Sequence, residues 1–340
     1  MAALTPLPLS AALSDGLRAA PWRYVVTGAN GWLGRATLAA LCAALGDAFS
    51  ERVTALGSRP GHIDIDGIAL PVLPLLDWTP PPGERLLVCH YAFLTMDKVQ
   101  GMSTEDYVAR NEAIRHAVLG WIASGAVQGA LVPSSGAVYD YLRGLDDPAL
   151  AAARNPHAVL YGRLKHEDEL AFQAACAAHG TRVVIPRVFN LAGPCINKFD
   201  AYALASFIAR LLQDGAITIH ARRPVLRSYY YIGDLLELSL GLLLRTDVTA
   251  ALCFDTAADE TVELDALARR VGAVLGRNAA PQRAPLDPAL AADCYVGNRT
   301  AIAALERQLG LQPLGLDQQI DATARFIAQE LAVPLPAPTR

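Results

Sequence analysis

Short apolar runs alternate with longer stretches of helical composition from residue 23 onward. Helical segments, such as residues 105–124 and 161–178, separate most of these runs. The predicted strands lie at residues 23–27, 52–56, 71–76, 85–90, 129–135 and 181–186. Their hydrophobicity is continuous rather than alternating, which is typical of strands buried on both faces of a sheet. We therefore predict an α/β fold with a doubly wound parallel sheet covered by helices.

Two segments depart from this pattern. The stretch HIDIDGIAL carries Asp66 and Gly67 at its centre, which predicts a small hairpin with a tight turn. From about residue 191 the pattern loosens into helices and short strands with more Arg, Pro and Gly. The predicted parts are an N-terminal arm, a sheet domain, a smaller mixed α/β region interleaved with it, and a tail, at residues 1–22, 23–190, 191–330 and 331–340.

The composition narrows the class of protein. Of the 340 residues 53% are hydrophobic and 18% are charged, which allows a large buried core and excludes disorder. The formal charge of -4 gives no reason to expect a nucleic-acid partner. The six cysteines lack the spacing of a metal site or a disulfide framework, so we expect buried thiols in a reducing compartment and no metal.

The sequence gives no sign of a membrane segment. The longest apolar run, residues 235–244, is interrupted by Glu237 and is shorter than the ~20 residues of a spanning helix. The first 22 residues lack a basic segment followed by an unbroken apolar one, so we read no signal peptide. We expect a cytoplasmic protein without a membrane partner.

A glycine-rich turn follows the first predicted strand. The string VVTGANGWLGRATLAAL places Gly28, Gly31 and Gly34 between that strand and its helix. Glycines there allow a sharp turn, a close approach of the backbone to a pyrophosphate, and tight packing of helix on strand. The helix N-terminus behind them offers N–H groups to an anion. The pattern predicts a nucleotide site, with a purely structural turn as the alternative.

The spacing of the glycines, together with Thr27, resembles the TGxxGxxG signature of the extended short-chain dehydrogenase/reductase superfamily. This resemblance runs from about residue 23 to residue 328 and implies a Rossmann-type NAD(P)-binding domain and a homodimer. It also implies that residues of the turn contact the cofactor. Those contacts are assigned to Thr27, Gly28, Asn30, Gly31, Trp32, Leu33 and Gly34.

The end of the second strand bears on the choice of cofactor. A carboxylate there would accept from the ribose 2′-OH of NAD, whereas an arginine accommodates the 2′-phosphate of NADP. Here Ser58 and Arg59 follow the strand without a carboxylate, which favours NADP(H) over NAD(H) unless the segment is an ordinary turn. The family places an acid near the adenine amino group, which matches Asp77, although Asp77 could equally cap a turn.

Other cofactor contacts follow from the resemblance alone. His90 and Ala92 belong to the string HYAF, where the family has a His-x-Ala-Ala-like turn under the pyrophosphate. Phe93 makes that match partial. Pro186, at the end of the sixth predicted strand, completes the predicted cofactor contacts together with the catalytic pair described next.

A tyrosine and a lysine lie one helical turn apart in the string YGRLK. The spacing puts Tyr161 and Lys165 on one helix face, and the chain has only three lysines, so a surface position is more often filled by arginine. An ammonium beside a phenol favours the phenolate and lowers the pKa of the phenol. We predict that Tyr161 is a general acid/base, that Lys165 tunes it, and that both contact the cofactor.

A hydroxyl and an asparagine complete the predicted catalytic set. Ser134 and Ser135 end a strand and could both be turn caps, but the family pattern Ser-Ser-x-x-Val-Tyr-Gly selects Ser135 as catalytic and substrate-binding. Asn111 matches a family asparagine that helps to hold the lysine site, although a helical asparagine could simply face water. The catalytic set is Ser135, Tyr161, Lys165 and Asn111.

The C-terminal part resembles the substrate end of nucleotide-sugar-modifying members of the family. In PRVFNLAGP, Asn190 matches an asparagine that contacts the substrate diphosphate. In the later string RPVLRSYYYIGDLLEL, Arg227 matches an arginine that binds the same diphosphate. The alternative for Arg227 is a surface salt bridge. Asp234 is predicted to cap the helix that follows. Together with Tyr161 and Ser135, these two residues form the predicted substrate contacts.

A departure from the family limits the reaction. Gly136 and Ala137 stand where nucleotide-sugar 4,6-dehydratases carry Asp-Glu, so dehydration is not expected. The sequence predicts an NAD(P)-dependent nucleotide-sugar epimerase or keto-sugar reductase of carbohydrate biosynthesis. Two alternatives stay open. One is an NADPH-dependent reductase of small ketones or aldehydes, and the other is a catalytically silent NAD(P)-binding regulatory protein.

Overall fold

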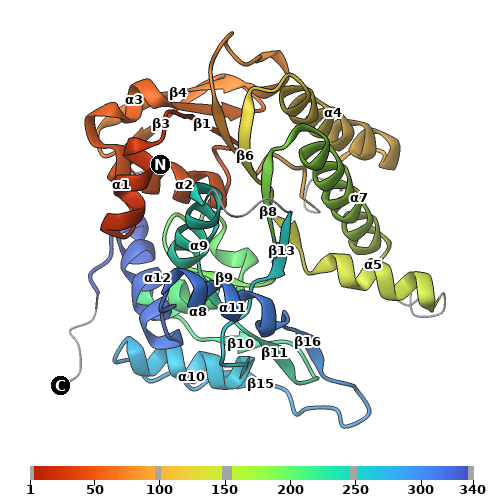
Figure 1. The fold of residues 1–340 in the computed structure, drawn as a ribbon. Helices are drawn as coiled ribbons and strands as arrows, with labels where there is room; N and C mark the ends of the chain where they lie inside the picture. Colours follow the sequence, from red (N-terminus) through yellow and green to blue (C-terminus); the bar gives the residue numbers. More distant parts are fainter. Residues whose placement is uncertain (1–3, 96–100, 148–154, 246–250, 336–340) are drawn as a thin grey trace. The chain divides into compact units, whose positions relative to one another are not determined.

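The computed structural model describes residues 4–95, 101–147, 155–245 and 251–335 (Figure 1). Its contacts define two units. The first, which we call the sheet unit, is built from Ala3–Val188 and Leu236–Phe254. The second, which we call the C-terminal unit, is built mainly from Phe189–Leu235 and Asp255–Arg340.

The sheet unit contains a large sheet whose strands run in the order β13-β8-β6-β5-β1-β2-β4-β3, with β7 paired to β8. Pairing is parallel from β8 through β6, β5, β1 and β2 to β4. The strands are β1 (Arg23–Thr27), β2 (Val53–Gly57), β3 (Gly61–Ile65), β4 (Ile68–Pro74), β5 (Leu86–His90), β6 (Val127–Leu131), β7 (Ser134–Ser135), β8 (Arg182–Val188) and β13 (Leu252–Asp255). The order reverses at β1, as in a Rossmann fold, so the predicted doubly wound sheet is confirmed.

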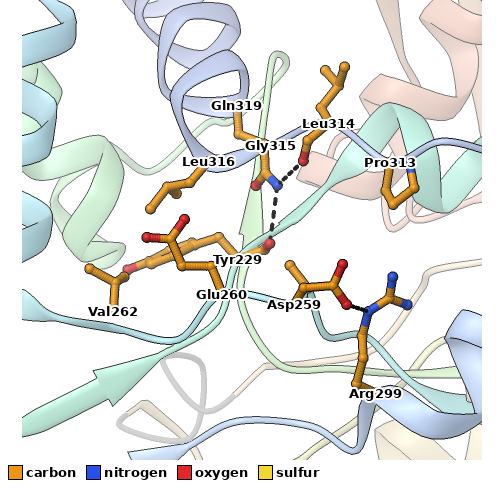
Figure 2. Close-up of a pocket in the computed structure, with 11 residues that line it drawn as sticks. Tyr229, Asp259, Glu260, Val262, Arg299, Pro313, Leu314, Gly315, Leu316 and Gln319 are labelled. Atoms are coloured by element: carbon orange, nitrogen blue, oxygen red, sulfur yellow. Dashed lines mark hydrogen bonds and ion pairs between the residues drawn. The ribbon is translucent and has the colours of Figure 1, made fainter.

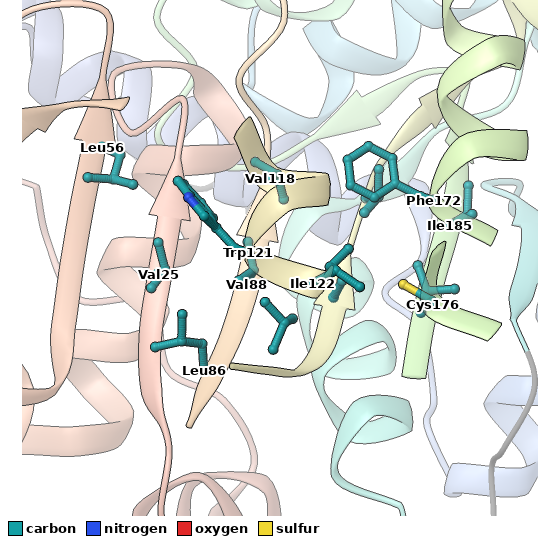
Figure 3. Close-up of a cluster of buried hydrophobic side chains, with 14 of the residues drawn as sticks. Val25, Leu56, Leu86, Val88, Val118, Trp121, Ile122, Phe172, Cys176 and Ile185 are labelled. Atoms are coloured by element: carbon teal, nitrogen blue, oxygen red, sulfur yellow. The ribbon is translucent and has the colours of Figure 1, made fainter. Parts of the chain in front are cut away.

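Helices cover both faces of this sheet, with α4 and α7 on one face and α2 and α9 on the other (Figure 1). The helices are α1 (Ala11–Ala19), α2 (Trp32–Leu45), α3 (Phe49–Arg52), α4 (Thr104–Ala123), α5 (Ala137–Asp146), α7 (Pro156–His179) and α9 (Ile232–Leu244). Under α4 and α7, Ile122 and Phe172 pack on Val88 of the central strand β5 (Figure 3). Trp121 meets Trp78 edge to face, at 4.8 Å between ring centroids. This core holds the two helices firmly on the sheet.

The predicted hairpin is present at the edge of the sheet. Strands β3 and β4 are antiparallel, and the turn residues Asp66 and Gly67 both have positive φ (52° and 80°). Two positive φ values define a type I′ turn, which suits the twist of the strands. Strand β4 continues to Pro74 and so absorbs most of the run that we predicted as a separate strand. At the outer side of β3, the N–H of Leu4 donates to the carbonyl of Asp64 at 2.9 Å.

The segment before β1 is more ordered than the arm that we expected. It contains α1, whose N-terminus is capped by the Ser10 hydroxyl, with Leu13 and Leu17 buried one turn apart. The guanidinium of Arg52 donates to the carbonyls of Arg18 and Trp22 at the C-terminal end of the segment. Helix α1 is therefore held on the rest of the sheet unit by its buried apolar face and by hydrogen bonds to carbonyls at and after its C-terminal end.

Among its described residues, the C-terminal unit combines helices with three small sheets. The sheets pair β9 with β12, β11 with β14 and β16, and β10 with β15. The helices are α8 (Ala203–Leu212), α10 (Leu264–Val274), α11 (Arg299–Leu309) and α12 (Leu316–Leu331), and the strands are β9 (Leu191–Ala192), β10 (Thr218–Ile219), β11 (Val225–Arg227), β12 (Tyr230–Tyr231), β14 (Val262–Glu263), β15 (Gln282–Arg283) and β16 (Asp293–Tyr295). Within this unit, α8 packs against α10 and α12.

The predicted cap of α9 is wrong. The helix begins at Ile232, directly after β12, so Asp234 lies inside its first turn. The Asp234 carboxylate instead accepts a hydrogen bond from the backbone N–H of Leu314 at 2.7 Å. Asp234 thus ties the start of α9 to the segment that leads into α12. Within the described residues, no helix is both long and apolar enough to cross a membrane.

Candidate nucleotide and catalytic site

The carboxyl ends of β1 and β5 lie side by side where the strand order reverses. Thr27 is in register with His90 across the parallel pair. In doubly wound sheets ligands bind in the crevice outside this point. The chain places its glycine-rich turn directly after β1, so the sequence and the topology select the same place.

The glycine turn has room only for glycine. Gly28 has a φ of +66°, and a Cβ on it would lie 2.7 Å from the backbone nitrogen of Ala92. A Cβ on Gly34 would lie 2.3 Å from the carbonyl oxygen of Gly28. Gly31 precedes the first residue of α2, and no side chain caps that helix. The turn therefore keeps the backbone close to β5 at the N-terminus of α2, where the positive end of the helix dipole fits a pyrophosphate.

The Thr27 hydroxyl holds the segment after β5. It accepts hydrogen bonds from the N–H groups of Tyr91 and Ala92, both at 3.1 Å, and lies 2.8 Å from Nδ1 of His90. Because a hydroxyl has one proton and here accepts twice, it donates that proton to Nδ1. His90 is then neutral with its proton on Nε2. Burial, with a smaller contribution from the charge of Lys165, lowers the pKa of His90 to about 3.

The residues predicted to select the cofactor are exposed. Ser58 and Arg59 follow β2 at the surface, and Asp77 ends a short 3-10 helix (Leu75–Asp77), also exposed. The Asn30 side chain reaches the end of β2, since a Cβ on Gly57 would lie 3.4 Å from its Nδ2. The turn and the end of β2 are thus neighbours, and no carboxylate lies between Gly57 and Gly61 in the sequence.

Helix α7 carries the Tyr161 and Lys165 pair to the strand that ends in Ser135. A Cβ on Gly162 would lie 2.3 Å from the carbonyl oxygen of Ala137, so α7 approaches the start of α5 very closely. Lys165 Nζ donates to the carbonyl of Pro133 at 3.1 Å. These contacts bring α7 at Gly162 and Lys165 close to residues 133–137, the segment that contains Ser135.

The two serines of β7 differ in their surroundings. Successive residues of a strand point to opposite faces, so the hydroxyls of Ser134 and Ser135 cannot serve one site together. The Ser135 hydroxyl accepts from the N–H of Ala137 at 3.2 Å. The Ser134 hydroxyl is buried without a hydrogen-bond partner among the described residues. The assignment of Ser135 as the catalytic hydroxyl stays a prediction.

Lys165 is a buried cation. Its side chain is 9% exposed, and burial lowers the pKa of the ammonium, while the carboxylates of Asp168 and Glu169 act in the opposite direction. The ammonium nitrogen lies 4.0 Å from the ring centroid of Phe93. The Phe93 ring in turn meets the ring of Tyr161 edge to face, at 5.5 Å. In the sequence Phe93 stood out only as a departure from the family turn.

Asn111 is buried and does not face water. Its Oδ1 accepts from the N–H of Leu94 at 2.8 Å, and its Nδ2 donates to the carbonyl of Tyr107 at 3.1 Å. It therefore fixes the loop after β5. Phe93, the neighbour of Leu94, contacts Lys165 and so links Asn111 to the lysine.

Pro186 lies in the middle of β8 at a position that needs no N–H. Residues before it pair with β6, and residues after it pair with β7. Next to it, the guanidinium of Arg187 forms two hydrogen bonds with the buried carboxylate of Glu169, at 2.8 and 2.7 Å. This fork, which sequence reasoning missed, fastens α7 to β8.

Two of the four predicted substrate residues, Asn190 and Arg227, belong to the C-terminal unit, whereas Ser135 and Tyr161 belong to the sheet unit. Asn190 Nδ2 donates to the carbonyls of Ser228 and Tyr295, at 3.3 and 3.1 Å. Arg227 pairs with Asp293, with its Nη2 3.0 Å from a carboxylate oxygen. The salt bridge that was the alternative for Arg227 is therefore present. Asn190 and Arg227 both connect segments of this unit that are distant in the sequence, since their partners are Ser228, Tyr295 and Asp293.

The C-terminal unit also contains a cavity of about 220 Å³ (Figure 2). Gln319 spans one side, donating to the carbonyls of Leu314 and Tyr229 at 2.7 and 3.2 Å. Arg299 and Asp259 form an ion pair on another side, at 2.9 Å. None of the predicted catalytic or binding residues lines this cavity. Across the described residues, no cluster of three His, Cys, Asp or Glu side chains could hold a metal ion.

Together the Rossmann sheet and the glycine turn at its switch point define an enzyme of the extended short-chain dehydrogenase/reductase type. More specifically, the chain belongs to the NAD dependent epimerase/dehydratase family, which residues 24–250 match.

Solved structures and curated proteins with similar chains carry related descriptions. A UDP-glucose-4-epimerase from Stenotrophomonas maltophila, with bound NAD and formylated UDP-arabinopyranose, superposes with a TM-score of 0.67 at 17% identity, over 92% of this chain and 100% of that one. The NAD dependent NDP-hexosamine 5,6-dehydratase TunA gives a TM-score of 0.64 at 21% identity, over 89% and 97%. UDP-glucuronic acid decarboxylase 6 from Arabidopsis thaliana is 34% identical over 74 residues, 22% of this chain and 21% of that protein. The match thus spans about a fifth of the length of this curated relative.

Proposed function

We propose that this protein is an NAD(P)-dependent nucleotide-sugar epimerase or keto-sugar reductase. The observation that carries the proposal is the close approach of α7, at Gly162 and Lys165, to residues 133–137, which include the strand-end Ser135. The bound nicotinamide cofactor would accept or supply hydride at the sugar ring. The chain itself must bind and orient the sugar and move a proton.

Each of the three side chains has a distinct role in the proposal. Ser135 positions the sugar hydroxyl or ketone. Tyr161 takes or returns the proton of that oxygen as general acid/base. Lys165 favours the phenolate of Tyr161 through its charge and holds the nicotinamide ribose. Because Lys165 also donates to Pro133, its ammonium is fixed close to the strand that presents Ser135.

The substrate class rests on Asn190, Arg227 and the relatives. Both residues stand in motifs that resemble the diphosphate-binding segments of nucleotide-sugar enzymes, and the relatives described above act on or bind nucleotide sugars. Because a dehydratase and an epimerase both share this fold, the fold does not distinguish between the two reactions. Gly136 and Ala137 supply no acid pair for elimination, which favours epimerisation or reduction.

One observation supports a second candidate, an NADPH-dependent reductase of small ketones or aldehydes. The guanidinium of Arg227 already has a carboxylate partner in Asp293, and a reductase of small carbonyl compounds needs no diphosphate contact. Binding of UDP-, dTDP-, CDP- and GDP-sugars to the purified protein separates the candidates. If none of the four binds, the nucleotide-sugar proposal is wrong.

The proposed chemistry is tested by Tyr161→Phe. This change keeps the shape of the side chain and removes its proton, so turnover should fall by about 100-fold or more. Steady-state assays with the sugar nucleotide that binds give the rate, and cofactor titration checks that the site is intact. Tyr202→Phe, at an exposed position of the C-terminal unit, is the matched control and should turn over normally. Turnover of Tyr161→Phe within a few-fold of wild type removes Tyr161 from the mechanism.

The cofactor preference is tested separately. Ser58 and Arg59 are exposed at the end of β2 and offer a hydroxyl and a guanidinium to a 2′-phosphate. We therefore expect NADP(H) to bind at least as tightly as NAD(H), although of the proteins described above TunA is NAD dependent and the Stenotrophomonas epimerase has bound NAD. Competitive titration of the purified protein with both cofactors decides. A tenfold preference for NAD(H) contradicts the prediction and favours an epimerase that retains its NAD.

A further inference from the structure

An aromatic ring covers the buried lysine of the proposed site. The ammonium of Lys165 lies 4.0 Å from the ring centroid of Phe93, closer than the ~6 Å within which a cation is attracted to a ring face. The ring of Tyr161 meets the same Phe93 ring at an interplanar angle of 86°. One side chain therefore contacts both members of the predicted catalytic pair.

The backbone of Phe93 is fixed on both sides. Before it, the N–H of Ala92 donates to the Thr27 hydroxyl at 3.1 Å. After it, the N–H of Leu94 donates to Asn111, and the Leu94 carbonyl accepts from the Tyr107 hydroxyl at 2.7 Å. The ring also packs on the buried side chains of Tyr107 and Leu164. A ring held in this way has little freedom to leave Lys165.

The ammonium needs such a contact because it is buried. It donates one hydrogen bond, to Pro133. The carboxylates of Asp168 and Glu169 on α7 act on it at longer range, and His90 on β5 is neutral because its pKa is near 3. Asp168 is in turn paired with Arg115 on α4, at 3.2 Å. The negative face of the Phe93 ring is the group that directly covers the cation.

We propose that Phe93 is a positioning residue of the catalytic site, which holds the Lys165 ammonium on its ring face and the Tyr161 ring at its edge. The proposal rests on the proposed function for its catalytic meaning. The contact itself concerns only side chains of the sheet unit. The proposal also gives Asn111 a role, because its hydrogen bond with Leu94 fixes the loop that carries Phe93. A small residue at position 93, as in the family turn, would make no such contact.

The chain is well suited to a direct test, because it contains three lysines, Lys98, Lys165 and Lys198. Lysine labelled with ¹³C at Cε gives three signals, which Lys98→Arg and Lys198→Arg assign. In the wild type the Cε protons of Lys165 should be shifted upfield by the ring current of Phe93. Phe93→Tyr keeps the ring and should keep this shift, whereas Phe93→Leu should lose it.

Titration of the same signals measures the charge of Lys165. The ring face favours the charged form, so Phe93→Leu should lower the pKa of Lys165 by about one pH unit, a tenfold change in its ionisation. Phe93→Tyr should leave this pKa within a few tenths of a unit. If Phe93→Leu does not fold, Phe93→Met, which has a flexible side chain of similar volume, takes its place. Unchanged proton shifts and an unchanged pKa in the aliphatic variant overturn the proposal.

Turnover provides the second readout. The pH above which activity falls should move down by about one unit in Phe93→Leu and stay in place in Phe93→Tyr, since the mechanism requires a charged lysine beside Tyr161. A pH profile that is equal in all three proteins contradicts the positioning role. Failure of the proposed function looks different, because the wild type would then show no turnover while the lysine signals still report the contact.

Discussion

At the scale of single residues, Thr27 shows how one hydroxyl organises the nucleotide end. It connects the end of β1 to His90, the last residue of β5, and to the two residues that follow, by donating to His90 and accepting two N–H groups. The glycines of the turn need this arrangement, since a Cβ on Gly28 would collide with the same segment. The Thr27 hydroxyl and the absence of a Cβ on Gly28 both allow the turn to lie close to Tyr91 and Ala92.

Replacing Thr27 by valine should therefore destabilise the sheet unit. Thr27→Val keeps the shape but leaves the N–H of Ala92 and Nδ1 of His90 unsatisfied in a buried place, at a cost of about 2 kcal/mol in the free energy of unfolding. Denaturant titration measures the change. Thr27→Ser, which keeps the hydroxyl, is the control and should lose much less. Equal stability of the two variants contradicts the role given to the hydroxyl.

The motif residues of the site were predictable from the sequence because each belongs to a local pattern. Gly28, Tyr161 and Lys165 stand at motif spacings, and the structure brings Lys165 and Gly162, the neighbour of Tyr161, close to residues 133–137. Phe93 was not predictable in this sense. Its contact joins a loop after β5 to a helix about 70 positions later in the chain, and no periodicity in the sequence records that packing.

At the scale of elements, the position of α7 decides whether the catalytic side chains meet. Gly162 lets α7 approach the start of α5, and the fork between Arg187 and Glu169 fastens the helix to β8. Glu169 is 2% exposed, and its pairing with the Arg187 guanidinium offsets the cost of burying the carboxylate. The pairing keeps Arg187 protonated by raising its pKa further above its usual range.

Gly162→Ala should push α7 away from residues 133–137. A Cβ there would meet the backbone of Ala137 at 2.3 Å, which a flexible side chain cannot relieve. We expect a loss of turnover of at least tenfold, because a displacement near 1 Å can cost about 100-fold, together with a lower free energy of unfolding. Turnover and denaturant titration are the measurements.

The chain offers a matched control for that change in α4. Gly120 also lies inside a helix, but nothing lies within 4 Å of a Cβ built on it. Gly120→Ala should therefore stabilise the protein by about 0.5–1 kcal/mol and leave turnover unchanged. If Gly162→Ala behaves like Gly120→Ala, the close approach of α7 does not control the site.

Most of the elements were predictable, but helix α1 and the role of Asp234 were not, and the strand predicted at residues 71–76 is largely part of β4. Continuous hydrophobicity in the sequence indicates the buried strands, and the pair Asp66 and Gly67 indicates the turn of the hairpin. Helix α1 was missed because its pattern is short, with Leu13 and Leu17 carrying its buried face. Asp234 was misread because a carboxylate near a helix start is a common cap, whereas its partner, the N–H of Leu314, lies 80 positions away. In both cases tertiary contacts, not local propensity, decide.

At the scale of the whole molecule, the two units divide the proposed tasks. The glycine turn and the Tyr161–Lys165 pair belong to the sheet unit, whereas Arg227 and Asn190 belong to the C-terminal unit. Arg227→Ala should therefore weaken sugar-nucleotide binding by about 10- to 150-fold, the loss of a charge-assisted contact. NAD(P) binding should stay nearly unchanged. Isothermal titration with both ligands measures the two effects.

Two further variants sharpen this comparison. Arg227→Lys should recover only part of the affinity, because an ammonium cannot reproduce the guanidinium fork. Asp293→Asn removes the carboxylate that now pairs with Arg227 and should strengthen sugar-nucleotide binding. If Arg227→Ala binds sugar nucleotides as well as the wild type, the substrate class is wrong.

The bridge at Leu4 bears on the behaviour of the protein in concentrated solution. Strand β3 ends the sheet, and its outer side would otherwise present free backbone groups to other molecules. Leu4 donates to the carbonyl of Asp64 and accepts from the N–H of Asp66, so its short segment covers part of that side. A shortened chain that begins at α1 would keep every residue of the proposed site. It would also uncover a strand edge that can recruit other chains, and so it would aggregate more readily.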